Sequence, residues 1–109
     1  MKRVDMALTH FRKQVELDPG NGNCYDSLGD GWTAKGNLVE AIAAYRQALA
    51  LNPQLFASLR SLGKALEQAG RRDEAIAHYR HCAKLGAEKG IQQLVRESKE
   101  RLKALGVKE

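Results

Sequence analysis

The amino-acid sequence repeats itself at an interval of 34 residues, and this repetition restricts the chain to folds built from stacked units. At this shift Leu28-Gly29 coincides with Leu62-Gly63. The segment 40–46 coincides with 74–80, and the residues Glu-Ala-Ile-Ala and Tyr-Arg stand at the same places in both. Such self-similarity is typical of repeat proteins, in which each unit buries its apolar surface against its neighbours.

The matching positions divide a single predicted domain, 1–109, into units. Two units are complete, 22–55 and 56–89, and the second half of a unit occupies 1–21. The last segment, 90–109, has apolar residues at helical spacing along one side and many charged residues on the other. This pattern is typical of the capping helix that ends a repeat array.

Each unit has the pattern of two helices joined by a short turn. Gly36-Asn37 and Gly70-Arg71 interrupt the helical pattern at equivalent places. Asn52-Pro53 ends a unit, because a residue before proline avoids the helical region. Gly29 and Gly63 lie inside predicted helices, where glycine costs about 1 kcal/mol relative to alanine, so we expect a second helix to pass too close for a Cβ atom. Helices are predicted over residues 5–17, 22–35, 38–51, 55–69, 72–85 and 90–105.

The size and spacing of the repeated residues resemble the tetratricopeptide repeat family. The family pattern is W-x-x-L-G-x-x-Y, then A-x-x-x-F, then P. The first complete unit contains Tyr25-x-x-Leu28-Gly29-x-x-Trp32, Ala41-x-x-x-Tyr45 and Pro53. The second contains Leu59-x-x-Leu62-Gly63-x-x-Leu66 and Ala75-x-x-x-Tyr79, with Ala87 in place of the proline. The resemblance implies an all-α fold of six helices, in which antiparallel helix-turn-helix pairs stack in a right-handed superhelix.

Composition and charge argue against several classes of function. The net charge is +5, but aromatic residues make up only 6% of the chain, and no basic stretch is interleaved with them as a nucleic-acid platform requires. No apolar run approaches the roughly 20 residues of a membrane helix, so we expect a cytoplasmic protein or a fragment of a longer chain. The two cysteines are too few for a disulfide framework.

Residues that could carry chemistry have simpler structural interpretations. His78, His81 and Cys82 share a helix face and could supply metal ligands, but Cys82 falls where the repeat requires a small buried residue. Cys24 lies in the first turn of a predicted helix, where a thiol pKa can be lowered, yet no histidine is near it in the repeat register. We therefore predict a non-catalytic protein without a metal or a cofactor.

The resemblance implies that a protein or peptide partner binds along the concave face formed by the first helix of each repeat. The residues predicted to be exposed on that face are Asn23, Asp26, Ser27, Asp30, Thr33, Arg60, Ser61, Lys64, Glu67 and Gln68. The repeat register places Asp26 near Arg60 and Asp30 near Lys64. These charges form either a ladder of ion pairs, each worth under about 1 kcal/mol, or a pattern that selects the partner.

Some members of the family hold chaperone C-terminal carboxylates with a clamp of lysine, asparagine and arginine. The clamp positions are occupied here by Asp26, Asp30, Ser61, Ile91 and Val95. None of these residues matches, and the two aspartates would repel a carboxylate. We therefore expect no partner of this kind.

Two alternatives place the function elsewhere. Segment 1–21 is a second helix without its first-helix partner, and its apolar residues are Met6, Leu8, Phe11, Val15 and Leu17. An uncovered apolar stripe of this kind often marks an interface, which suggests either that the missing half of the unit lies upstream in a longer protein or that another copy covers the stripe in a homodimer. The stretch Tyr25-Asp26-Ser27-Leu28-Gly29-Asp30 resembles repeats appended to bacterial hydrolases, which would place an activity outside this chain.

Overall fold

A computed structural model describes residues 2–107, and these residues form six α-helices. The helices are α1 (Lys2–Leu17), α2 (Gly22–Lys35), α3 (Leu38–Leu51), α4 (Phe56–Gln68), α5 (Arg72–Lys89) and α6 (Gln92–Ala104). The all-α class and the number of helices in the described range confirm the sequence prediction. No helix within this range is both long and apolar enough to cross a membrane.

The ends of the helices follow from local residue chemistry. The Asn21 side chain accepts a hydrogen bond from the backbone N–H of Asn23 at the start of α2, and Asn37 caps α3 in the same way. The turn between these helices contains Gly36, whose φ of +85° lies in the left-handed region that glycine adopts without strain. These residues explain why the boundaries of α2 and α3 were predicted correctly.

The predicted end of α5 at residue 85 was wrong, because the helix continues to Lys89. The equivalent helix α3 ends at Leu51, immediately before Asn52-Pro53. The second unit has no proline at this place, so nothing stops the backbone from continuing by another turn. Gly90 then ends α5 with a φ of +70°.

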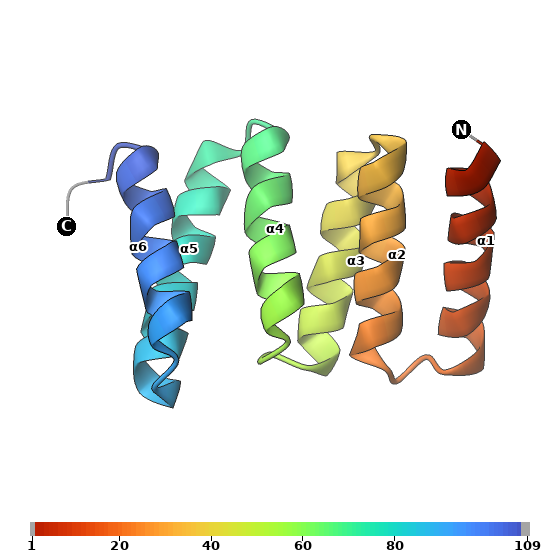
Figure 1. The fold of residues 1–109 in the computed structure, drawn as a ribbon, viewed down its shortest axis with the longest axis horizontal. Helices are drawn as coiled ribbons and strands as arrows, with labels where there is room; N and C mark the ends of the chain where they lie inside the picture. Colours follow the sequence, from red (N-terminus) through yellow and green to blue (C-terminus); the bar gives the residue numbers. More distant parts are fainter. Residues whose placement is uncertain (1, 108–109) are drawn as a thin grey trace. The chain divides into compact units, whose positions relative to one another are not determined.

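Contacts divide the chain into two compact units, Met1–Ala69 and Gly70–Glu109. In the first unit α2 packs against α1, α3 and α4, and α3 also packs against α4 (Figure 1). In the second unit α5 packs against α6. Helix α2 is therefore the centre of the first unit, and it contributes half of the predicted interaction residues.

The crossing of α2 and α3 depends on Gly29 and Tyr45. A Cβ atom at Gly29 would lie 2.5 Å from Tyr45 Cε1, which is closer than real contacts allow. The Tyr45 side chain is only 2% exposed, and Ala41 and Ala48 on the same helix are fully buried. The prediction that Gly29 marks a close helix crossing is therefore confirmed.

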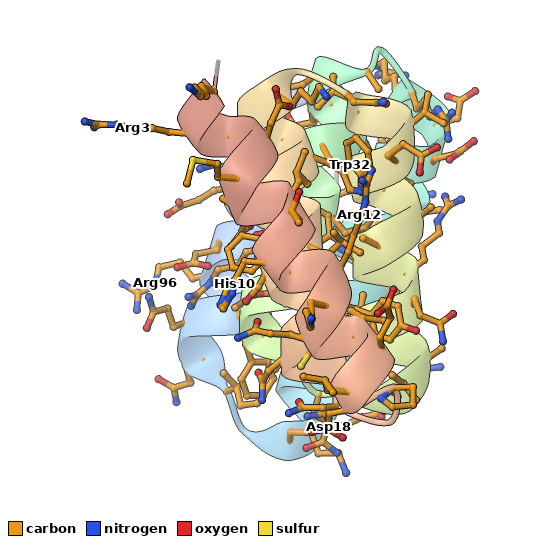
Figure 2. All side chains as sticks on the ribbon, turned by 90° about the vertical axis from the view of Figure 1, so that its right-hand side faces the viewer. Arg3, His10, Arg12, Asp18, Trp32 and Arg96 are labelled. Carbon is orange, nitrogen blue, oxygen red and sulfur yellow. The ribbon has the colours of Figure 1, made fainter. Side chains whose placement is uncertain are left out.

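Helix α1 is held on α2 by apolar and charged contacts. A Cβ atom at Gly31 would lie 2.8 Å from Leu8 Cδ2, so the absence of a side chain allows α1 to pack closely there. Figure 2 shows the Arg12 side chain beside the ring of Trp32, with Cζ 4.8 Å from the ring centroid. This distance is typical of a cation–π contact. The sequence predicted that the apolar residues of α1 form one uncovered stripe. In the structure some of them are buried and others are exposed: Leu8 is buried, whereas Met6 is 66% exposed.

Candidate interaction surface

All ten residues predicted for partner binding lie on two helices of the first unit. Asn23, Asp26, Ser27, Asp30 and Thr33 are on α2, and Arg60, Ser61, Lys64, Glu67 and Gln68 are on α4. Because α2 and α4 pack against each other, we refer to these ten residues together as the α2–α4 surface. Each of them is either half-buried or exposed, so each retains some contact with solvent.

Asp26 links the two helices through a hydroxyl group. Ser58 Oγ on α4 donates a hydrogen bond of 2.6 Å to Asp26 Oδ1, and the Ser58 residue is completely buried. Burial raises the pKa of Asp26 above its usual value, although the Ser58 hydrogen bond acts in the opposite direction. The repeat register had placed Arg60 near Asp26; the hydrogen bond that the structure gives Asp26 comes from Ser58 on the same helix, α4.

Asp30 is held in place by the neighbouring helix α3. Tyr45 Oη donates a hydrogen bond of 2.6 Å to Asp30 Oδ1 and lies 3.2 Å from Thr33 Oγ1. Burial, followed by the Asp30 hydrogen bond, raises the pKa of Tyr45 to about 12. Tyr45 therefore stays protonated at neutral pH and acts as a permanent donor to a carboxylate that is exposed to solvent.

The two hydrogen bonds give the α2 side of the surface a fixed pair of carboxylates. Free aspartate side chains lose rotamer entropy when a partner immobilises them. Here the folded chain already restricts Asp26 through Ser58 and Asp30 through Tyr45. The α4 side contributes the exposed cations Arg60 and Lys64. The surface therefore carries charges of both signs, with the carboxylates oriented in advance.

The structure adds residues of α1 that the sequence analysis did not assign to this region. A hollow of about 360 Å³ is lined by Gln14, Leu17, Asp18, Asn23, Cys24 and Ser27. Asn23 and Ser27 belong to the α2–α4 surface, so the hollow extends that surface toward α1. Leu17 is 77% exposed, and it offers an apolar contact beside the polar residues. The sequence marked Leu17 only as part of an apolar stripe, because the repeat register does not tell which side of α1 faces α2.

Two family models match the chain. One, described as a TPR repeat, matches residues 29–70, and the other, described as a tetratricopeptide repeat, matches residues 58–93. Residues 29–93 belong to the tetratricopeptide repeat family. The resemblance inferred from the repeated residues is thereby confirmed. Among curated proteins, no relative matches the chain at a significant level.

Tetratricopeptide repeat domains are generally protein-interaction modules, and no catalytic family matches this chain. The Gly29 and Tyr45 contact described above joins two positions of the repeat motif. The family assignment therefore favours protein interaction as the general role of this domain.

The histidines and the cysteine of the second tetratricopeptide repeat do not gather on one open site. Cys82 is only 2% exposed, and its Sγ lies 3.4 Å from His78 Nε2, whereas His81 is exposed. Burial raises the pKa of the Cys82 thiol to about 11, which the Ser98 hydrogen bond partly opposes. A protonated thiol is a poor nucleophile and a poor metal ligand. In residues 2–107, no three histidine, cysteine, aspartate or glutamate side chains lie together so that they could hold a metal ion.

Proposed function

We propose that this tetratricopeptide repeat protein binds an extended or short helical segment of a partner protein on the α2–α4 surface, without catalysing a reaction. The observation that carries the proposal is the pair of hydroxyl-held carboxylates, Asp26 with Ser58 and Asp30 with Tyr45. A surface aspartate that serves only solubility does not need a donor from a neighbouring helix. Orientation before binding reduces the entropy lost when a partner docks.

The charge pattern supports a partner segment that itself carries both signs. Basic side chains of the partner would contact Asp26 and Asp30 on α2, and acidic side chains would contact Lys64 on α4. Opposed charges of this kind favour one orientation of the bound segment and disfavour its reverse. We also propose that residues 22–55 and 56–89 are the two complete repeats and that 90–109 caps the array.

A selected peptide provides the test of this proposal. Peptides that bind the wild-type protein are isolated from a display library, and their affinity is measured by fluorescence anisotropy. Lys64→Glu is expected to weaken binding by about tenfold, because it replaces an attraction by a repulsion at an exposed site. Lys13→Glu, an equal change of charge at an exposed position of α1, is the control and should change the affinity less than about twofold.

Loss of affinity in both variants would mean that net charge alone governs binding. Unchanged affinity in both would mean that the peptides bind elsewhere, and either result would contradict the proposal for the α2–α4 surface. Far-UV circular dichroism of each variant confirms that the helices are intact before affinities are compared.

Self-association is a second candidate function, and the exposure of Met6 on α1 favours it. Met6 is 66% exposed, and large apolar residues at the surface can mark an interface between copies. If residues 1–21 form a homodimer, light scattering should give a mass that rises toward twice the monomer as concentration increases. Met6→Glu should abolish that rise. A monomer mass at every concentration would eliminate this candidate.

An activity outside the chain is compatible with either candidate. The likeness of residues 25–30 to repeats appended to bacterial hydrolases suggests a binding domain that recruits or positions a catalytic one. In that case the peptide test above still applies to the domain itself.

A further inference from the structure

The second unit contains a hollow of about 710 Å³ where the end of α5 meets α6. Its apolar lining consists of Gly86, Ala87, Gly90 and Val95. A Cβ atom at Gly86 would lie 2.9 Å from Val95 Cγ2, so α6 packs closely on α5 at this point. The small residues around this contact leave open space beside it, and we call this space the α5–α6 hollow.

Cations line the α6 side of the hollow. Arg96, Lys99 and Lys103 all contribute to it, and their spacing of three and four residues places them on one face of the helix. Each is exposed, and within residues 2–107 none of these three side chains makes a hydrogen bond or an ion pair with a protein group. Glu100 is the one carboxylate among the lining residues, so the lining carries a net charge of about +2.

A capping helix needs a polar outer face for solubility, which accounts for charge at these positions but not for the excess of cations over the single carboxylate, Glu100, in the lining. Like charges three or four residues apart on a helix repel each other and destabilise it slightly. The helix dipole favours a cation in the last turn, which accounts for Lys103. It does not account for Arg96 or Lys99, which lie further from the end of α6. A ligand with negative charge would turn the repulsion into an attraction.

We propose that the α5–α6 hollow binds an acidic peptide segment of a partner protein. The rise of about 1.5 Å per helical residue separates Arg96 and Lys103 by about 10 Å along α6. An extended peptide covers that distance in about three residues, so two or three carboxylates in a short acidic run can reach the cations. A small apolar side chain of the same peptide fits against Val95 and Ala87.

The lining favours a peptide over the other polyanions. Single-stranded nucleic acids bind through stacking on aromatic side chains as well as through cations, and no aromatic residue lines the hollow. An anionic membrane surface is contacted by helices that also present large apolar residues. The apolar lining here is restricted to glycine, alanine and valine. This inference does not depend on the α2–α4 surface, because it concerns residues of the second unit alone.

The experiment uses the full chain and a fluorescein-labelled, glutamate-rich peptide with one central valine as the probe. The triple variant Arg96→Glu, Lys99→Glu, Lys103→Glu should bind the probe at least about tenfold more weakly than the wild type. The control triple variant Lys2→Glu, Arg3→Glu, Lys13→Glu makes the same change in net charge on exposed residues of α1. It should bind within about twofold of the wild type.

A neutral substitution tests the shape of the hollow separately. Ala87 is exposed, so Ala87→Leu should leave the fold intact while its larger side chain fills the hollow. It should weaken binding of the probe by about fivefold or more. Equal weakening in the two triple variants, or full binding by Ala87→Leu, would overturn the proposal. Stronger binding of single-stranded DNA or of phosphatidylserine vesicles than of the peptide would overturn the choice of ligand. Because this probe is acidic and the α2–α4 test uses selected peptides, either proposal can fail alone.

Discussion

Replacing Tyr45 by alanine is expected to lower the free energy of unfolding by about 3–5 kcal/mol. The ring is 2% exposed and fills the space left open by Gly29 between α2 and α3. Alanine would leave a cavity there and would also remove the donor to Asp30. Since small domains have a total stability of about 5–15 kcal/mol, the loss should be obvious in urea denaturation followed by far-UV circular dichroism.

Tyr45→Phe separates the ring from its hydroxyl group. Phenylalanine keeps the packing against Gly29 but cannot donate to Asp30, and the expected cost is about 1–2 kcal/mol because Asp30 remains accessible to water. Tyr45→Ala is expected to lower the free energy of unfolding much more than Tyr45→Phe, because only alanine removes the buried ring. Equal costs for the two variants would show that the hydroxyl group, and not the ring, contributes most of the stability.

The second large effect is expected for Gly29→Ala, which should cost about 1–3 kcal/mol. Alanine has the better intrinsic helix propensity, by about 1 kcal/mol, so the substitution would be stabilising if space were available. The added Cβ atom would instead lie 2.5 Å from Tyr45 Cε1, and the two helices would have to move apart. Urea denaturation of the variant measures the net result.

Two comparisons make this prediction specific. Gly20→Ala adds a Cβ atom that meets no heavy atom within 4 Å, and it should change the stability by less than about 1 kcal/mol. In the Tyr45→Ala background, Gly29→Ala should lose its destabilising effect, because the ring that causes the clash is absent. A full cost in that background would mean that Gly29 is required for a reason other than the ring.

The sequence predicted most of the fold because its strongest signals are local. Gly36 and the asparagines Asn21 and Asn37 set helix ends through their own backbone preferences and side-chain caps. The close helix crossing at Gly29 could be predicted from the sequence, because a second helical glycine, Gly63, stands at the same place one repeat later despite its low helix propensity. The last residue of α5 was mispredicted because its position was inferred from the first unit, where Pro53 follows the helix. The second unit has no proline at the equivalent place.

The candidate surface was less predictable, because it depends on which side of each helix faces its neighbour. The repeat register drew attention to Arg60 beside Asp26, but it gave no sign that the buried Ser58 donates a hydrogen bond to that carboxylate. The register also gave no reason to connect Leu17 with Asn23, which line the same hollow. The sequence indicated a charged side for segment 90–109, but the hollow beside Arg96, Lys99 and Lys103 depends on how α6 packs on α5.

The central claim is that the α2–α4 surface binds the partner segment. The most direct measurement is the change in backbone amide chemical shifts of isotope-labelled protein when a selected peptide is added. The largest changes are predicted for residues of α2 and α4, including Asp26, Asp30 and Lys64. Changes confined to α1 around Met6, or to α6, with the amides of α2 and α4 unaffected, would contradict this account.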